Sequence, residues 1–275
     1  KNFWYLKDDL WKLVDKYKAN YFQTVPTIIN VITNNKYKKY IKPKSIKFIG
    51  SGSAILPWQL KKKFEKKYKI KISNFYGLSE IGCSHFDEPF LKNKKKGQIG
   101  KILPGFSYKI FNSMHLSGRN AIGELGVKSK TLLTSYYNDK YLFKKSFKKG
   151  YFLTGDYVSI DKNKTFYYVD RKKDLIIKGG VNILPSEIEN VIQNIKEVKE
   201  VAVTSIFDEF YGENICAYVV LDKKFKFNLK KIDNYCLNQL GNFKKPNKFV
   251  FLNNLPKGPS GKVLKLLLKK KYEKK

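Results

Sequence analysis

Apolar residues recur with a helical period in the first part of the chain, and short apolar runs lie between these stretches. An amphipathic helix is predicted within residues 1–20, where apolar side chains recur every three or four positions: Phe3, Leu6, Leu10, Leu13, Val14 and Tyr17. Pro26 can open a second helix, and Pro57 begins a lysine-rich one. The runs 45–49 and 71–75 predict strands, the second of which ends at Tyr76–Gly77. This alternation predicts an α/β fold with parallel strands.

The pattern changes after about residue 96. Between residues 98 and 160, short apolar segments are broken by Gly, Asn and Lys, which predicts antiparallel β-structure. After Asp174 the α/β rhythm returns, with strands at 198–207, 215–221 and 249–252 and helices at 185–195, 229–240 and the C-terminal end. We therefore expect an α/β segment over residues 1–96, a β-rich subdomain over 97–170, a hinge at 171–174 and a small α+β domain over 175–275.

The segment at 170–192, DRKKDLIIKGGVNILPSEIENVI, combines a charged turn, an apolar run and a glycine pair. Two adjacent glycines fit best where the chain bends sharply or a ligand passes close. The simplest interpretation is a strand that turns at Gly179–Gly180 and leads into a helix. Ser186 and Glu189 have the spacing of a capping box, so Ser186 is predicted to cap the helix that starts near Pro185.

The chain is strongly basic, since 56 basic and 23 acidic residues give a net charge of +33. Such a charge is typical of proteins that bind nucleic acids or anionic membranes. Only Arg119 and Arg171 are arginines, however, and base recognition favours arginine. We therefore expect no specific nucleic-acid partner and interpret most lysines as solvated, while peripheral membrane contact through the basic surface stays open.

Cysteines and histidines indicate no structural metal site. Cys83, Cys216 and Cys236 lie far apart without a Cys-x-x-Cys spacing, which favours a reducing compartment, either the cytoplasm or the surface of an organelle membrane. The two histidines, His85 and His115, form no ligand pair and are interpreted as loop residues. The chain begins with Lys1 and its only methionine is at position 114, so we expect an N-terminal part to be missing.

Four motifs follow one another along the chain: SNFYGLSE at 73–80, GYFLTGD at 150–156, DRKKDLIIKGG at 170–180 and LPKGPSGK at 255–262. Together they resemble the adenylate-forming acyl-CoA synthetase superfamily, and most of all its fatty-acyl-CoA synthetases. The resemblance covers about the whole chain. It implies the C-terminal part of the adenylating fold, which consists of the end of the large α/β domain, its β-rich subdomain and a small mobile C-terminal domain.

The resemblance also implies a reaction in two halves. A carboxylate attacks the α-phosphate of ATP and gives an acyl-adenylate and pyrophosphate; a thiol, normally that of coenzyme A, then displaces AMP. The first half joins two anions, so it requires Mg²⁺ and a lysine that offset charge at the phosphate. The implied substrates and cofactors are therefore ATP, Mg²⁺, a carboxylic acid, in this case a fatty acid, and CoA.

In the first motif, the resemblance implies that Glu80 supports Mg²⁺ and that Ser79, in place of the usual Thr, contacts the phosphate. Tyr76 resembles the aromatic residue that stacks on adenine, although core packing is an alternative. Asn74 and Gly77 belong to the same implied nucleotide site. The turn Gly52–Ser53–Ala54 resembles the adenine-lining turn, with Ser53 where Gly is commoner.

Gly77 carries a second expectation. In acetate-activating relatives a bulky tryptophan occupies the matching position, so Gly77 would leave the acyl pocket open to a medium or long chain. Phe75 weighs against this expectation, because relatives often have a smaller residue there.

The later motifs carry the other implied roles. Asp156 resembles the carboxylate that accepts the ribose hydroxyls, and Arg171 the arginine that contacts ribose and phosphate. Lys262 resembles the lysine that bridges the carboxylate and the α-phosphate, although a surface lysine is the plain alternative. Lys173 falls at the pivot about which the small domain rotates between the two halves, and Gly179 and Gly180 would line the pantetheine tunnel.

The Gly/Ser/Thr-rich phosphate loop of this superfamily is not found in these residues. We therefore expect this chain alone to be inactive, with part of the triphosphate site and much of the acyl pocket in the missing N-terminal part. Two alternatives stay open: adenylation followed by transfer to a carrier-protein thiol, and a non-catalytic nucleotide-binding protein. The presence of both Glu80 and Lys262 argues against the second.

Overall fold

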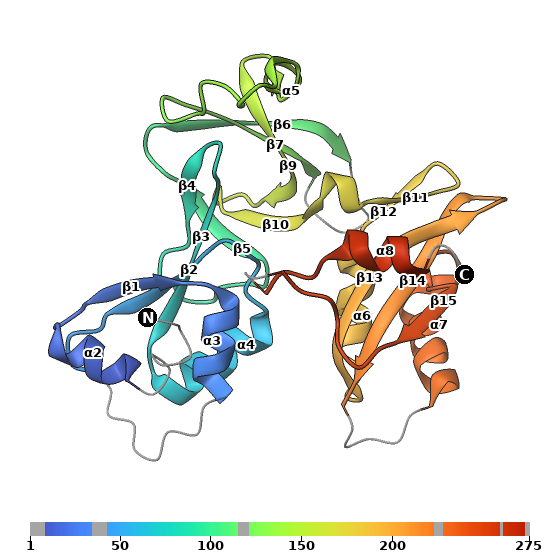
Figure 1. Cartoon of the computed structure of the whole chain (residues 1–275), viewed down its shortest axis with the longest axis horizontal. Helices are drawn as coiled ribbons and strands as arrows, with labels where there is room; N and C mark the ends of the chain where they lie inside the picture. The colour runs from blue at the N-terminus through green and yellow to red at the C-terminus, as the bar shows by residue number, and fades with distance from the viewer. Residues whose placement is uncertain (1–8, 35–42, 115–120, 223–227, 259–260, 273–275) are drawn as a thin grey trace. The chain divides into compact units, whose positions relative to one another are not determined.

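The computed structural model describes residues 9–34, 43–114, 121–222, 228–258 and 261–272. They form two compact units (Figure 1). Unit 1 contains residues 1–154 and 158–168, and unit 2 contains residues 155–157 and 169–275. The change of unit at residue 169 comes two residues before the expected hinge.

Unit 1 begins with a parallel α/β segment, as the sequence predicts. Its strands are β1 (Tyr21–Thr24), β2 (Phe48–Ser51) and β3 (Lys71–Leu78), and its helices are α2 (Leu10–Lys16), α3 (Pro26–Asn34) and α4 (Trp58–Tyr68). The apolar helix faces meet in one core with the strands: Trp11, Val14, Ile29, Ile32, Ile46, Ile49, Phe64, Tyr68, Ile70 and Ile72. Phe3 and Leu6 of the predicted first helix lie outside the described residues.

Strand β3 is longer than the sequence predicts. It continues to Leu78, and β4 (Gly82–Phe86) then pairs with it antiparallel. The predicted end at Tyr76–Gly77 is therefore wrong, because the chain turns back only after Leu78 and uses the end of β3 for pairing. His85 lies in β4 and is fully buried, so its interpretation as a loop residue is also wrong. His115 lies outside the described residues.

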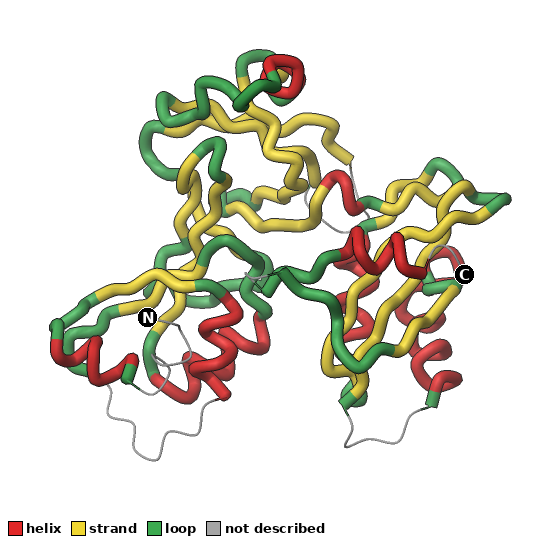
Figure 2. The backbone as a smooth tube through the Cα atoms, viewed as in Figure 1, coloured by secondary structure: helices red, strands yellow, loops and turns green. Residues whose placement is uncertain are grey.

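The rest of unit 1 is largely antiparallel, as predicted. It contains β5 (Gln98–Ile102), β6 (Phe106–Met114), β7 (Ile122–Ser129), α5 (Lys140–Lys145), β8 (Phe147–Lys148) and parts of β9 (Tyr151–Ile160) and β10 (Phe166–Arg171). Residues 155–157 of β9 and 169–171 of β10 belong to unit 2. The strands continue one sheet in the order β1-β2-β3-β4-β5-β10-β9-β7-β6. Figure 2 draws the strands in yellow. A second core fills this part: Ile81, Ile99, Leu125, Val127, Phe152, Val158 and Phe166.

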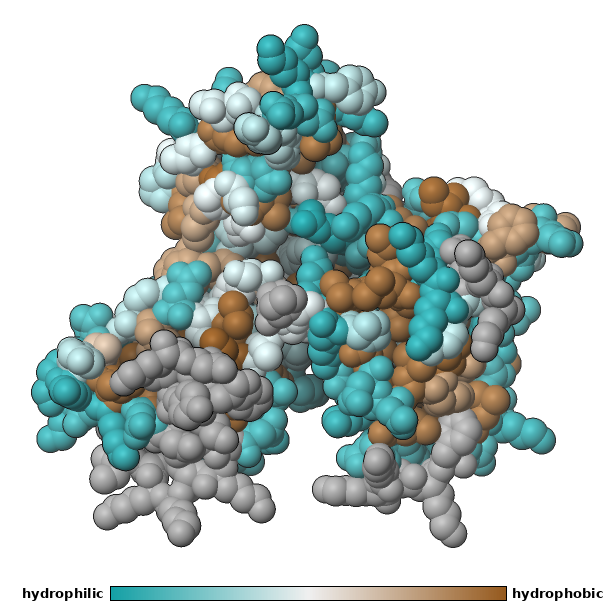
Figure 3. Space-filling view, viewed as in Figure 1, coloured by the Kyte–Doolittle hydropathy of each residue, from teal (hydrophilic) through white to brown (hydrophobic). Residues whose placement is uncertain are grey.

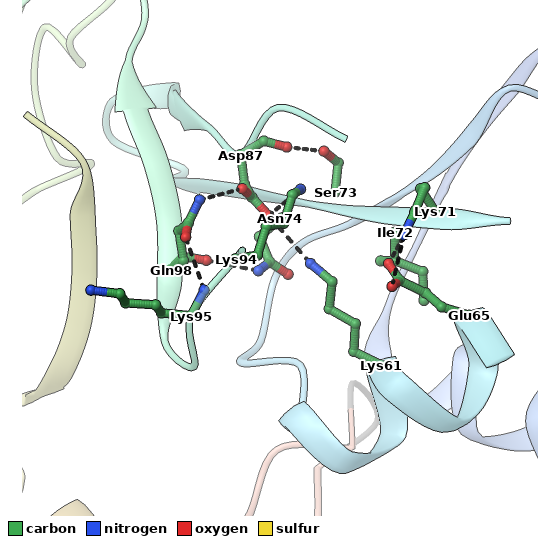
Figure 4. Close-up of polar contacts among 10 residues, drawn as sticks. All are labelled: Lys61, Glu65, Lys71, Ile72, Ser73, Asn74, Asp87, Lys94, Lys95 and Gln98. Carbon is green, nitrogen blue, oxygen red and sulfur yellow. Dashed lines mark hydrogen bonds and ion pairs between the residues drawn. The ribbon is translucent and has the colours of Figure 1, made fainter. Parts of the chain in front are cut away.

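A buried carboxylate joins the two parts of unit 1 (Figure 4). Asp87 is fully buried and accepts the Gln98 side-chain amide at 2.9 Å. Its other oxygen accepts Nζ of Lys94 at 2.9 Å and of Lys61, on α4, at 3.3 Å. Because a buried charge is tolerated only when it is paired and hydrogen-bonded, this cluster fixes α4 to the segment before β5.

Unit 2 contains a smaller sheet with helices. Its elements are η1 (Lys172–Asp174), β11 (Ile176–Lys178), β12 (Val181–Ile183), α6 (Pro185–Gln193), β13 (Val198–Asp208), β14 (Gly212–Leu221), α7 (Leu229–Lys244), β15 (Lys248–Phe251) and α8 (Lys265–Tyr272). The sheet order is β12-β11-β14-β13, with β15 parallel to β14. This combination of a largely antiparallel sheet and helices confirms the predicted α+β character of the C-terminal part.

Strand β14 shows why the sheet of unit 2 is covered on both faces. Successive side chains of a strand point to opposite faces. Ile215, Ala217 and Val219 join a core with α6 and α7, whereas the intervening residues Cys216, Tyr218 and Val220 join another with Leu268 of α8. A nearly continuous apolar strand is thus buried on both sides.

Helix α6 is not capped as the sequence predicts. Its N-cap position is Leu184, which makes no side-chain cap hydrogen bond, and Pro185 takes the first helical position. Ser186 therefore lies inside the first turn, and its backbone N–H donates to Oδ2 of Asp170 at 2.9 Å. Glu189 accepts the N–H of Val203 at 2.8 Å instead of closing a capping box. The capping-box prediction is wrong.

The glycine pair also differs from the simplest interpretation. Gly179 and Gly180 turn the chain between β11 and β12, which pair antiparallel, and α6 begins only after β12. Both glycines have positive φ, +54° and +79° respectively, a conformation that glycine adopts without steric cost. The turn is therefore the tip of a hairpin.

Hydrophilic residues are spread over the face of both units that Figure 3 shows. This distribution agrees with the interpretation of most lysines as solvated surface residues. None of the helices in the described ranges is both long and apolar enough to cross a membrane.

Candidate nucleotide and acyl-transfer site

In unit 1, the Gly52–Ser53–Ala54 turn lies at the carboxyl end of β2. Strands β2 and β3 are parallel, with Ser51 opposite Asn74, so the carboxyl ends of their paired segments lie side by side. Ligands of parallel α/β sheets bind at such carboxyl ends. Gly52 passes close to β3: a Cβ added there would lie 3.5 Å from the carbonyl oxygen of Phe75. Ser53 has a φ of +65°, in the left-handed region that favours glycine.

Tyr76 and Asn74 both make contacts within unit 1. The half-buried Tyr76 ring meets His85 edge-on with centroids 5.4 Å apart, and it packs against the second core. The Asn74 side-chain amide donates to the carbonyl oxygen of Gln98 at 2.8 Å. These contacts fix both residues at the end of the parallel segment, and their roles toward a nucleotide stay predictions.

His85 on β4 lies opposite Tyr76 on β3 in the antiparallel pair. Its ring centroid is 4.4 Å from that of Phe166, and its Nδ1 is 2.9 Å from Oγ of Ser84. Burial lowers the pKa of His85 to about 4, so the imidazole is neutral near pH 7. His85 therefore supports Tyr76 as a packed, uncharged ring.

Gly77 does not border open space. A Cβ at this position would collide with the backbone carbonyl of Gly82 and would lie 2.9 Å from Cα of Cys83. The close approach of β4 explains why a residue without a side chain suits this position in this chain. A Cβ at position 77 would point into β4, so Gly77 serves the β3–β4 pairing, and its effect on the acyl pocket stays a prediction.

Ser79 and Glu80 form the turn between β3 and β4. Ser79 is exposed, whereas Glu80 is half-buried. Tyr136 donates its hydroxyl to Oε1 of Glu80 at 3.3 Å, and the N–H of Leu133 donates to the Glu80 carbonyl oxygen at 2.8 Å. Burial raises the pKa of Tyr136, and the charge of Glu80 raises it further. The segment before α5 thus orients the carboxylate.

Glu80 fits the metal role that the sequence implies. Mg²⁺ takes oxygen ligands and is commonly held by one or two carboxylates together with substrate phosphates and water. Among the described residues, no group of three or more His, Cys, Asp and Glu could hold a metal by itself. The half-buried Glu80 carboxylate is thus suited to a metal ion that the phosphates of a nucleoside triphosphate also bind.

Within unit 2, the structure brings Asp156 and Arg171 together. Nε of Arg171 lies 3.1 Å from Oδ1 of Asp156, although fifteen residues separate them in the chain. Asp156 is almost fully buried, and the Arg171 side chain is about a quarter exposed. Gly155, between Thr154 and this carboxylate, has a φ of +69°. One residue of the TGD motif and one residue of the DRKKD motif, Asp156 and Arg171, therefore form an ion pair.

The predicted hinge residue, Lys173, and the glycine hairpin follow this pair in the chain. Lys173 is exposed within η1. The N–H of Gly179 donates to the carbonyl oxygen of Tyr211 at 2.9 Å, which holds the hairpin against the start of β14. The neighbouring Lys178 is buried, and its Nζ donates to the carbonyl oxygen of Phe243 at 2.9 Å. One side of the hairpin is thus firmly anchored.

Lys262 lies on a second, smaller hairpin of unit 2. Lys257 pairs antiparallel with Val263, and the N–H of Gly258 donates to the Lys262 carbonyl oxygen at 2.9 Å. Gly261 has a φ of +79°, which explains the glycine of the PSGK motif. Pro259 and Ser260 of this motif lie outside the described residues. The Lys262 side chain is exposed, and Glu80 belongs to the other unit.

Sequence reasoning missed three residues that organise these sites. Tyr136 contacts Glu80 across 56 positions, and Asp170 contacts Ser186 across 16. Lys265 forms an ion pair with Glu189. No periodicity or short motif marks such pairs. The signal that the sequence did carry for Asp170 and Lys265 is their place at the edges of two motifs.

The arrangement defines a class of protein. A parallel sheet edge with a glycine turn and an oriented carboxylate lies in one unit, while a polar pair, a glycine hairpin and a lysine hairpin lie in the other; this is the layout of adenylate-forming enzymes. The chain belongs to the AMP-binding enzyme family. The family's sequence profile, described as AMP-binding enzyme, matches residues 2–137, and the profile of the AMP-binding enzyme C-terminal domain matches residues 187–262.

Characterised relatives agree with this assignment. The chain is 34% identical over 257 residues to the long-chain-fatty-acid–CoA ligase of Bacillus subtilis, with 92% of this chain and 46% of that protein covered. It is 35% identical over 231 residues to the 2-succinylbenzoate–CoA ligase of the same organism, covering 82% and 46%. The chain thus spans about half the length of the curated relatives it matches.

Solved structures confirm the predicted fold class. ATP-bound MatB from Rhodopseudomonas palustris superposes with a TM-score of 0.86 at 28% identity, covering 97% of this chain and 53% of that one. The o-succinylbenzoate CoA synthetase MenE from Bacillus subtilis, in complex with ATP and magnesium ion, gives 0.79 at 28% identity, with 96% and 54% covered. The resemblance to acyl-CoA synthetases that the motifs carry is confirmed.

Proposed function

We propose that this chain belongs to a longer protein that activates a carboxylic acid with ATP and transfers the acyl group to CoA. The acid and ATP give an acyl-adenylate and pyrophosphate, and the CoA thiol then releases AMP. The observation that carries this proposal is the Asp156–Arg171 pair, because it joins two family motifs in one polar site. The similarity to several CoA ligases supports it.

For adenylation, the residues of each unit suggest a role of their own. The Gly52 turn and Tyr76 offer a backbone edge and an aromatic ring for adenine. The buried Asp156 can accept ribose hydroxyl hydrogens, while Arg171 can donate to ribose or phosphate oxygens from the same pair.

The chemical step requires positive charge where two anions meet. Lys262 is exposed and can place its ammonium between the acid and the α-phosphate, where a preorganised cation stabilises the transition state. Glu80, oriented by Tyr136, would hold Mg²⁺, which when bound supplies further charge neutralisation at the phosphates. Ser79 can donate its exposed hydroxyl to a phosphate oxygen.

For thioester formation, the hairpin at Gly179–Gly180 is the part of unit 2 suited to an extended thiol substrate. It is exposed and has no side chain at its tip, so a narrow pantetheine arm can pass close to its backbone. Because Lys262 and this hairpin are separate features of unit 2, each half-reaction would use one of them. Lys173 in the η1 turn is the proposed pivot for the exchange.

We further propose a fatty acid as the substrate. The support is the naming of relatives as long-chain-fatty-acid–CoA ligases, at 34% and 31% identity. Relatives named for sulfoacetate and 2-succinylbenzoate match at 30% and 35%, so overall identity does not separate these acids. The acid has to be identified by experiment.

The decisive experiment is ATP–pyrophosphate exchange by the full-length protein with acetate, octanoate, palmitate, 2-succinylbenzoate and sulfoacetate. We expect exchange that depends on an added acid and is fastest with palmitate or octanoate, followed by a CoA thioester when CoA is added. Exchange that is fastest with acetate would contradict the fatty-acid proposal. Exchange without thioester would favour a carrier-protein acceptor, and absence of exchange with any acid would contradict the activity.

A further inference from the structure

The hairpin that carries Lys262 is attached to the body of unit 2 by both of its ends. On the first side, Nζ of Lys257 lies 2.5 Å from Oε2 of Glu200 on β13. On the second side the hairpin leads directly into α8, where Nζ of Lys265 lies 2.7 Å from Oε1 of Glu189 on α6. The hairpin closes with the N–H of Leu264 donating to the Pro256 carbonyl oxygen at 2.9 Å.

The Lys265–Glu189 pair is the more enclosed of these two attachments. The Lys265 and Glu189 side chains are 20% and 23% exposed, against 39% for Lys257 and 29% for Glu200. Oε1 of Glu189 also accepts the N–H of Val203 on β13, which fixes the carboxylate. Lys265 is therefore held by a partner that itself cannot easily move.

Acidic residues around the predicted hinge also act electrostatically on Lys265. Burial lowers its pKa, but the carboxylates of Glu189, Asp170 and Asp174 together raise it above the ordinary value. Asp170 caps α6 through Ser186, and Asp174 ends η1. The cation thus stands among three acidic groups from α6, from the end of β10 and from η1.

We propose that Lys265 is a positioning residue for Lys262. Its ion pair with Glu189 fixes the start of α8, and with it the leg of the hairpin that ends three residues earlier at Lys262. Lys265 does not touch the substrates in this role; it sets where the Lys262 ammonium stands. The inference rests on the proposed adenylation role of Lys262, and it assigns to that step a residue that no short motif singles out.

A purely structural role for the ion pair is the competing explanation, and unit 2 offers a matched control. Lys244 on α7 pairs with Glu187 on the same helix α6 at 3.0 Å, with side chains 32% and 22% exposed. This pair joins two helices and has no connection to the Lys262 hairpin. Lys244→Met should therefore disturb α6 about as much as Lys265→Met, without moving Lys262.

The test uses the full-length protein with the variants Lys265→Met, Lys265→Arg, Glu189→Gln, Lys244→Met and Lys262→Ala. Four quantities are measured: kcat and KM for ATP in pyrophosphate exchange, the rate of thioester formation from supplied acyl-adenylate and CoA, and the thermal midpoint. We expect Lys265→Met and Glu189→Gln to lower the exchange kcat about 10-fold or more, since misplacement of a reacting group is costly. Their thioester rates should stay within about 2-fold, Lys265→Arg should recover most of the exchange, and Lys244→Met should leave both steps unchanged.

Several results would overturn the inference. One is a parallel fall in exchange and thioester formation in Lys265→Met; another is an equal loss of exchange in Lys244→Met. If Lys262→Ala collapses exchange while Lys265→Met and Glu189→Gln do not alter it, the positioning role alone is wrong. If Lys262→Ala leaves exchange intact, the adenylation role of Lys262 and the positioning role are both wrong. Should Lys265→Met not fold, Glu189→Gln decides, because its amide can still accept the Val203 N–H.

Discussion

The carboxylate of Asp170 caps a helix that Ser186 was expected to cap. Oδ2 of Asp170 accepts the backbone N–H of Ser186 at 2.9 Å, and its Oδ1 accepts the N–H of Arg171 at 2.9 Å. One buried side chain therefore satisfies a donor at the start of α6 and a donor at the end of β10. The helix start and the segment before the predicted hinge are fixed by the same group.

Asp170→Ala should accordingly destabilise unit 2, whereas Ser186→Ala should not. Loss of a capping carboxylate typically costs about 0.5–2 kcal/mol, and we expect the upper part of this range because two half-buried N–H donors lose their acceptor. Ser186→Ala keeps the backbone N–H and should change stability by less than about 0.5 kcal/mol. Urea unfolding of the two variants beside the wild type measures both values. A larger loss for Ser186→Ala would restore the capping-box assignment.

His85 should make the stability of unit 1 depend on pH. Burial lowers its pKa to about 4, below the value of about 6.5 in the unfolded chain. Between these values the unfolded state binds a proton that the native state does not, so stability falls as the pH drops from 6.5 towards 4. From pH 7 to pH 5 this one group should remove about 2 kcal/mol.

The corresponding measurement is urea unfolding at pH 7 and pH 5 for the wild type and His85→Gln. The variant lacks the titrating ring, so its loss of stability between the two pH values should be smaller than that of the wild type by about 2 kcal/mol. Both proteins share every other titrating group, which makes the difference specific to position 85. Equal losses would show that the ring is protonated in the native state.

Comparison of particular residues shows what the sequence could and could not predict. Period and composition predicted the parallel segment around β2 and β3, because buried strands and amphipathic helices have different spacings. They failed at the end of β3, which continues to Leu78 because β4 turns back and pairs with it. They failed also at Ser186, where a local capping pattern competed with a carboxylate sixteen positions away. Long-range contacts decide such positions.

The residues of the candidate site also divide into those that the sequence identified and those that it missed. The motifs identified the residues that carry charge or lie at glycine turns, including Glu80, Asp156 and Arg171. They could not identify the residues that hold these groups in place, such as Tyr136, because support depends on which segments the fold brings together. Family resemblance assigns the roles of the first set, and the contacts of the folded chain alone reveal the second.

Tyr136 provides a test of that support. Its hydroxyl donates to Oε1 of Glu80 at 3.3 Å, so Tyr136→Phe should leave the carboxylate in place but less well oriented. Groups that orient a metal ligand typically change metal affinity about 10–100-fold, and a long hydrogen bond suggests the lower end. We expect the Mg²⁺ concentration for half-maximal pyrophosphate exchange to rise several-fold in the full-length protein. Tyr137→Phe is the control, because Tyr137 is 93% exposed. An equal effect of both variants, or none of either, would contradict a role of Tyr136 at Glu80.

Substitutions within unit 2 should separate the two half-reactions. Lys262→Ala removes the proposed cation at the meeting point of acid and phosphate. Loss of such an electrostatic contact typically costs about 10²–10³ in rate, so pyrophosphate exchange should collapse. Thioester formation from supplied acyl-adenylate should persist, because the Gly179–Gly180 hairpin is untouched. A substitution at Gly180 should have the opposite effect.

Gly180→Asn is the most informative substitution at the hairpin. Gly180 has a φ of +79°, and asparagine tolerates positive φ better than most residues. A Cβ built there has no described atom within 4 Å, so the hairpin itself can accept the side chain. A slower thioester step with normal exchange would therefore reflect obstruction of the thiol substrate. Gly150→Asn, at a turn with a φ of +78° and the same open surroundings, controls for the backbone change. The measurement is single-turnover kinetics in which pyrophosphate release and thioester formation are followed separately. If Gly180→Asn slowed adenylation first, or if Lys262→Ala slowed both steps equally, the two hairpins would not serve different half-reactions.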